Sequence, residues 1–118
     1  MSQSVLRERA KAFAKNIIYL VEKIKSGKKD HVLTSQLLRS GTSIGANIYE
    51  ARYAQSNLDF ISKLEIALKE SYETEYWLEL IFDAGYIDAK TFEQYNSECG
   101  SLRKMLISSC KTAKSKLL

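Results

Sequence analysis

Apolar residues recur along most of this chain at intervals of three and four positions, the spacing of one face of an α-helix. The pattern is broken near Gly27, Ser56 and Gly85, where glycine and short polar side chains gather. It therefore predicts four helices, at about residues 4–26, 31–54, 57–84 and 88–115. Because short connections place consecutive helices antiparallel, the sequence predicts an all-α fold, an antiparallel up-down four-helix bundle, in one domain over residues 1–118.

Short polar residues before three of these helices are suited to cap them. Asp30, Ser56 and Asp88 each precede a helical segment, and their side-chain oxygens can accept a hydrogen bond from a backbone N–H of the first turn. Asp59 follows Ser56 by three residues, so the pair resembles a capping box with Asp in place of Glu.

The predicted second helix holds two interior glycines, Gly41 and Gly45, each of which costs roughly 1 kcal/mol relative to alanine. This cost indicates that the helix backbone approaches a neighbour closely. The apolar seam of this helix consists of Leu37, Gly41, Ile44, Ile48 and Ala51. A stripe of mostly small polar residues runs beside it: Gln36, Ser40, Ser43, Asn47 and Glu50.

The polar stripe could hydrogen-bond to another helix of the bundle, to another subunit or to a ligand. Such residues more often satisfy one another at the edge of a tightly packed helix, and we favour that interpretation over a ligand site. The candidate residues for helix or subunit contacts are Arg39, Gly41, Ser43, Gly45, Asn47 and Glu50.

Charge is distributed unevenly along the chain, whose net charge is +4. Residues 1–31 carry +5 and residues 88–118 carry +3, whereas residues 57–87 carry −5 and residues 32–56 only +1. One interpretation is that the acidic third helix lies beside basic helices, within the chain or across a subunit contact. The other is a basic face for nucleic acid. Charge alone favours the first.

The residue types present give little support to catalysis, and we predict no enzyme, no metal and no cofactor. A di-metal bundle site needs Glu-x-x-His pairs, but Lys28 occupies the position three residues before the single histidine, His31. No Cys/His set has zinc spacing, and Gly41 and Gly45 do not begin a phosphate-binding loop. His31 is expected to face solvent at a helix start.

Cys99 and Cys110 lie 11 positions apart on one predicted helix. This spacing separates them by roughly 16 Å, too far for a disulfide. Reduced thiols indicate a cytoplasmic setting. We see no secretory signal and no run of about 18 apolar residues, so no membrane span is expected.

The second helix resembles the signature of the four-helix-bundle proteins encoded in intervening sequences of bacterial 23S rRNA genes, also labelled S23 ribosomal protein. The matching stretch, residues 33–51, reads Leu-Thr-Ser-Gln-Leu-Leu-Arg-Ser-Gly-Thr-Ser-Ile-Gly-Ala-Asn-Ile-Tyr-Glu-Ala. Later residues fit the same pattern: Asp59, Phe60, Leu64, Ile66, Ala67, Leu68, Glu73, Glu75, Leu78, Asp83, Ala84, Gly85 and Tyr86.

The resemblance implies a cytoplasmic bundle that assembles as a homopentamer with a central channel. It also implies kinship with the accessory variability determinant proteins of diversity-generating retroelements, which are basic barrels that bind nucleic acid and a reverse transcriptase. No catalytic residues come with the family. By position, Arg39, Ser43, Asn47 and Glu50 are signature residues, and we expect them to act structurally.

Our leading hypothesis is a non-enzymatic oligomeric bundle that binds RNA or DNA through phosphate contacts. Five copies would raise a charge of +4 to about +20, and multivalency would increase avidity. No aromatic residue is interleaved with the basic candidates, and no nucleic-acid motif is present. The candidate phosphate contacts are Arg7, Lys11, Lys15, Arg103, Lys104, Lys111 and Lys114.

Two alternatives stay open. The first is a protein–protein adaptor or scaffold without nucleic-acid binding, whose basic helices pair with the acidic third helix of a neighbour. The second, weaker alternative is a small ligand held in the channel of an oligomer.

Overall fold

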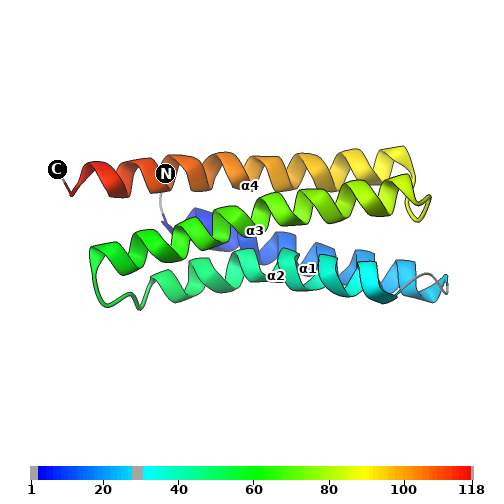
Figure 1. Cartoon of the computed structure of the whole chain (residues 1–118), viewed down its shortest axis with the longest axis horizontal. Helices are drawn as coiled ribbons and strands as arrows, with labels where there is room; N and C mark the ends of the chain where they lie inside the picture. The colour runs from blue at the N-terminus through cyan, green and yellow to red at the C-terminus, as the bar shows by residue number, and fades with distance from the viewer. Residues whose placement is uncertain (1–2, 28–30, 118) are drawn as a thin grey trace.

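The computed structural model describes residues 3–27 and 31–117, which form four α-helices and no strand. The helices are α1 (Gln3–Ser26), α2 (His31–Ala51), α3 (Asn57–Asp83) and α4 (Ala89–Ser115). Figure 1 shows them running alternately in opposite directions, so that α1 begins and α4 ends at the same end of a bundle 50 Å long. The chain is the antiparallel up-down four-helix bundle that the hydrophobic pattern predicts.

Each helix packs mainly against the helices next to it in the sequence. α2 lies between α1 and α3, and α3 lies between α2 and α4, while α1 and α4 share a smaller contact. There the Tyr95 hydroxyl donates a hydrogen bond to the backbone carbonyl of Asn16 at 3.0 Å, and Asn16 Nδ2 donates one to Glu98 at 3.4 Å. α2 and α3 therefore form the middle of the bundle.

α3 and α4 each begin with a residue whose side chain caps the helix. Ser56 Oγ accepts a hydrogen bond from the Asp59 N–H at 3.0 Å, and the Asp59 carboxylate accepts one from the Gln55 N–H at 3.1 Å. Asp88 accepts one from the Thr91 N–H at 2.8 Å, and hydrogen bonds from the Thr91 side chain and backbone lower the pKa of Asp88. These bonds satisfy donors that have no partner inside a helix.

The helix ends follow two patterns. α2 ends at Ala51, three residues earlier than expected, because the next N–H groups bond to carbonyls three residues back rather than four. α3 ends in a Schellman turn, in which Gly85, at a φ of +81°, lets the Tyr86 N–H reach the Ile81 carbonyl at 3.0 Å. Asp30, the expected cap of α2, lies outside the described residues.

The apolar seam expected on α2 meets a buried seam of α1 in the core. The buried seam residues of α1 are Leu6, Ala10, Phe13, Ile17, Leu20 and Ile24. Those of α2 are Leu37, Gly41, Ile44, Ile48 and Ala51. The buried side chains of Ser40 and Thr74 connect α2 to α3. Thr74 Oγ1 donates a hydrogen bond to Ser40 Oγ at 3.0 Å. This pairing avoids the cost of an unsatisfied polar group in the core.

The two glycines of α2 face α1, but only one is required by packing. A methyl group at Gly41 would lie 3.0 Å from both Cγ atoms of Ile17, which is fully buried and branched at Cβ. At Gly45, a methyl group would lie 3.5 Å from the Ala10 carbonyl oxygen, an ordinary contact. The close approach of α1 to α2 therefore depends on Gly41.

We expect Gly41→Ala to destabilise the protein and Gly45→Ala to leave it unchanged or more stable. Both changes gain about 1 kcal/mol of helix propensity, so the difference between them isolates the contact with Ile17. Overpacking of this kind costs about 1–3 kcal/mol. Urea denaturation followed by circular dichroism measures both variants. Equal stability of the two would contradict the packing argument.

Candidate nucleic-acid interface

Two residues of the polar stripe of α2, Ser40 and Glu50, contact α3 of the same chain, as does the neighbouring Arg39. The Arg39 guanidinium pairs with two carboxylates of α3, lying 3.4 Å from Glu70 and in direct contact with Glu73. At the C-terminal end of the stripe, the Glu50 carboxylate lies 2.9 Å from Lys63 Nζ of α3. These pairs are largely exposed, so their contribution to stability is small, about 0–1 kcal/mol each. They mark the side of α2 that is turned toward α3.

The remaining predicted contact residues bond within α2 or face α1. Ser43 Oγ donates a hydrogen bond to the Arg39 carbonyl at 2.6 Å, and Asn47 Nδ2 donates one to the Ser43 carbonyl at 2.9 Å. Gly41 and Gly45 lie against α1. The predicted contact residues thus have partners inside the chain, and a role at a subunit interface stays a prediction.

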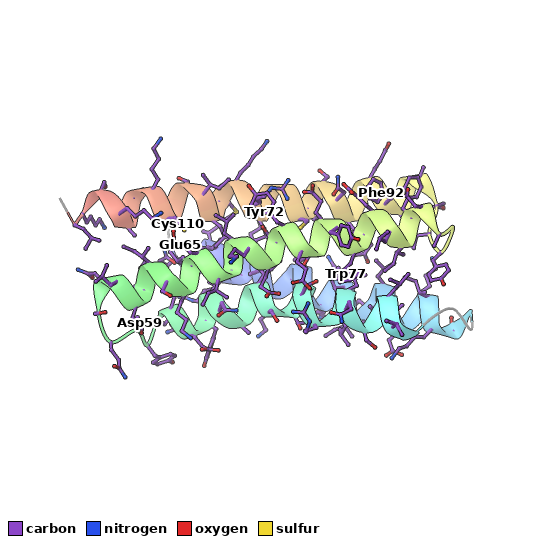
Figure 2. The ribbon with its side chains drawn as sticks, viewed as in Figure 1. Asp59, Glu65, Tyr72, Trp77, Phe92 and Cys110 are labelled. Carbon is purple, nitrogen blue, oxygen red and sulfur yellow. The ribbon has the colours of Figure 1, made fainter. Side chains whose placement is uncertain are left out.

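Two predicted phosphate contacts are engaged by the acidic helix α3. Arg103 Nη1 lies 2.5 Å from the Glu75 carboxylate, and the guanidinium carbon lies 4.9 Å from the centroid of the Tyr72 ring. Lys114 Nζ lies 2.7 Å from the Glu65 carboxylate. Figure 2 shows Glu65 and Tyr72 on the side of α3 that borders α4. The acidic third helix therefore lies beside basic residues of its own chain.

The predicted phosphate contacts on α1 have no such partners. Lys11 and Lys15 are exposed and Arg7 is half-buried, and none of the three forms an ion pair with another residue in the described ranges. Lys104 and Lys111 on α4 are likewise exposed, without a carboxylate partner in the part of the chain that the structure describes. The unpaired candidates are thus split between two faces.

A groove of about 430 Å³ lies between α1 and α2 on the outer side of the bundle. Arg7 and Lys11 line it from α1, and Tyr49 and Arg52 line it from the end of α2. The other lining residues are Glu8, Ala14, Thr42, Gly45 and Ala46. Three cations against one carboxylate give the groove a positive balance, and the small side chains leave it open.

Aromatic rings lie beside basic residues of this face in the folded chain. The Arg52 guanidinium lies 5.9 Å from the Tyr49 ring centroid and 5.7 Å from that of Tyr53. Lys15 Nζ lies 6.0 Å from the centroid of Tyr19. In the sequence, Arg52 and Tyr53 follow Tyr49 by three and four residues, a spacing that places side chains on one face of a helix. The net charge of residues 32–56 is close to zero, so the charge distribution does not point to this cluster.

The two cysteines are free, buried and held protonated. Burial raises the pKa of the Cys99 thiol to about 12, and its Sγ donates a hydrogen bond to the Ser71 carbonyl at 3.2 Å. Burial also raises the pKa of Cys110. Because the thiolate is the reactive form, these shifts disfavour a nucleophilic role for either side chain near neutral pH.

Metal binding and membrane insertion find no support in the described residues. Within residues 3–27 and 31–117, no cluster of His, Cys, Asp and Glu side chains is arranged to hold a metal ion. In those same ranges, no helix has both the length and the apolar character to cross a membrane. The side chain of His31, expected to face solvent, lies outside what the structure describes.

Alkaline pH should destabilise the protein through Cys99. The unfolded thiol loses its proton near its ordinary pKa of 9.0, whereas the folded thiol keeps it up to about 12. The folded state therefore binds more protons, and stability falls as pH rises from 9 toward 12. Cys99→Ala should reduce this decline by up to about 1.4 kcal/mol per pH unit in urea denaturation. Leu102→Ala, which also truncates a buried side chain of α4, controls for the cavity and should keep the wild-type slope.

Fold and surface together define a small antiparallel helical-bundle protein with an outer basic face. The sequence model of the 23S rRNA-intervening sequence protein family matches residues 3–108, and the chain belongs to this family. A crystal structure of a protein of unknown function from the S23 ribosomal protein family, from Bacteroides thetaiotaomicron, is similar. It has a TM-score of 0.91 and 47% sequence identity, over 94% of this chain and 99% of that chain. No curated protein matches this chain.

Proposed function

We propose that this protein is a non-enzymatic, oligomeric helical bundle that binds RNA or DNA through phosphate contacts on the outer face of α1 and α2. One observation carries the proposal. Arg7, Lys11 and Arg52 line the groove on this face, Lys15 follows one turn further along α1, and none of the four forms an ion pair with a carboxylate in the described ranges. Unpaired cations that face solvent along one side of a fold are the usual footprint of phosphate binding.

The contrast with α4 supports this choice of face. Arg103 and Lys114 are already close to carboxylates of α3, so a phosphate would have to displace a partner that is always present. Lys104 and Lys111 are exposed on α4, away from the groove between α1 and α2, so they lie outside the assigned contact. The α1–α2 face has the further advantage of Arg52, whose planar guanidinium can bond to phosphate oxygens in pairs.

Self-association would present several copies of this basic face to one ligand. In the homopentamer that the family resemblance implies, five copies of the same cations would bind one strand with an avidity well above that of one subunit. A reverse transcriptase as protein partner and a cytoplasmic location belong to the same proposal. The buried, protonated thiols agree with a reducing compartment.

A protein adaptor without nucleic-acid binding is the alternative, and the outer side of α3 favours it. Tyr72 and Tyr76 are each about half exposed there, and Ile66 is 40% exposed. Glu79, which is exposed and forms no ion pair in the described ranges, lies on the same helix. An apolar surface next to an unpaired carboxylate suits a basic protein partner, including the α1 face of a second copy.

Charge reversal on α1 separates the two functions. Lys11→Glu with Lys15→Glu should weaken binding to a dye-labelled oligonucleotide and leave the oligomer intact. Each phosphate contact of a single strand contributes about −0.7 to the slope of log K against log salt, so losing two should reduce the slope by about 1.4. Fluorescence anisotropy across a salt series measures the slope, and light scattering measures the mass.

The matched control is Lys104→Glu with Lys111→Glu, which changes the net charge equally but on α4. Binding reduced to the same extent by both pairs would show that only the overall charge matters and would contradict the assigned face. Dissociation of the oligomer by the α1 pair alone would favour the adaptor function.

A further inference from the structure

We propose that the nucleic acid bound on this face is single-stranded, and that its bases stack on the rings of Tyr49 and Tyr53 while Arg52 and the α1 cations hold its phosphates. This inference rests on the proposed function and adds the form of the ligand. It follows from the rings that the structure places beside the groove, a feature that phosphate binding alone does not need.

The two rings are available to a ligand. Tyr49 is 56% exposed and Tyr53 is 66% exposed, so most of each ring lies outside the core. Their centroids are 5.8 Å apart with the planes tilted by 50°, so the rings do not cover each other face to face. An exposed aromatic ring offers a surface on which any base can stack, independent of its sequence.

The charges lie where the backbone of a stacked strand would run. The Arg52 guanidinium is within 6 Å of both ring centroids, so a phosphate next to a stacked base comes within its reach. Across the groove, Arg7 and Lys11 are one helical turn apart, about 6 Å of rise. That separation is close to the distance between successive phosphates of an extended strand. Lys15, a further turn along α1, continues the row.

The groove itself admits a thin ligand. Its lining includes the small residues Ala14, Gly45 and Ala46, so a base or sugar can approach the helix backbones between the charged walls. A duplex presents phosphates to such a face but keeps the faces of its bases stacked on one another. With a duplex, the rings of Tyr49 and Tyr53 would have no partner, which is why the geometry favours a single strand.

The test compares one oligothymidylate of about 20 nucleotides, single-stranded and paired with oligoadenylate, by fluorescence anisotropy. We expect the wild-type protein to bind the single strand more tightly. Tyr49→Leu and Tyr53→Leu should each weaken single-strand binding by about 10-fold, since stacking on one ring accounts for that much or more, and should leave duplex binding unchanged. Tyr→Phe at both positions keeps the rings and should retain the affinity.

Tyr76→Leu is the matched control, because Tyr76 is similarly exposed, at 54%, but lies on α3. Equal binding of both nucleic acids that is insensitive to the leucine variants but lost on reversal of Lys11 and Lys15 would overturn this inference and keep the proposed function. No binding of either nucleic acid by an intact oligomer would overturn both. Dissociation of the oligomer by Tyr49→Leu or Tyr53→Leu would overturn the inference by placing the rings at a subunit contact.

Discussion

The close packing of α1 on α2 at Gly41 is the constraint on which the outer face depends. Because Ile17 fills the space where a side chain at position 41 would lie, the two helices meet along their apolar seams. Arg7 and Lys11 of α1 are thereby brought beside the end of α2. The stability of the bundle and the existence of the groove thus share one steric requirement, although the glycine itself lies in the core.

The distribution of carboxylates decides which cations stay available. α3 packs between α2 and α4, and its acids pair with Arg39 of one neighbour and with Arg103 and Lys114 of the other. Among the described residues, α1 has α2 and α4 as its neighbours rather than α3, so its cations do not lie beside the acidic helix. The order of the helices around the bundle therefore selects the basic face, more than the number of basic residues on each helix does.

Much of the fold could be predicted from the sequence, because it depends on local periodicity. The seam from Leu37 to Ala51, the caps Ser56 and Asp88 and the stop at Gly85 all follow from spacing and residue type. The face was harder to predict. Segment charges could not show that Arg103 is paired while Lys11 is not, since pairing depends on which helices touch. The cluster around Arg52 lies where α2 ends, and helix ends are the least regular part of the pattern.

The position of Arg52 and Tyr53, in the turn that follows α2, separates residues that hold the bundle together from residues that face solvent. Ala51, one residue earlier, is buried in the core, whereas Arg52 and Tyr53 are exposed. Substitution of either side chain is expected to leave the packing of the helices unchanged. Substitutions at these two positions therefore meet little constraint from folding, whereas those in the interior of α2 are limited by the packing of the core.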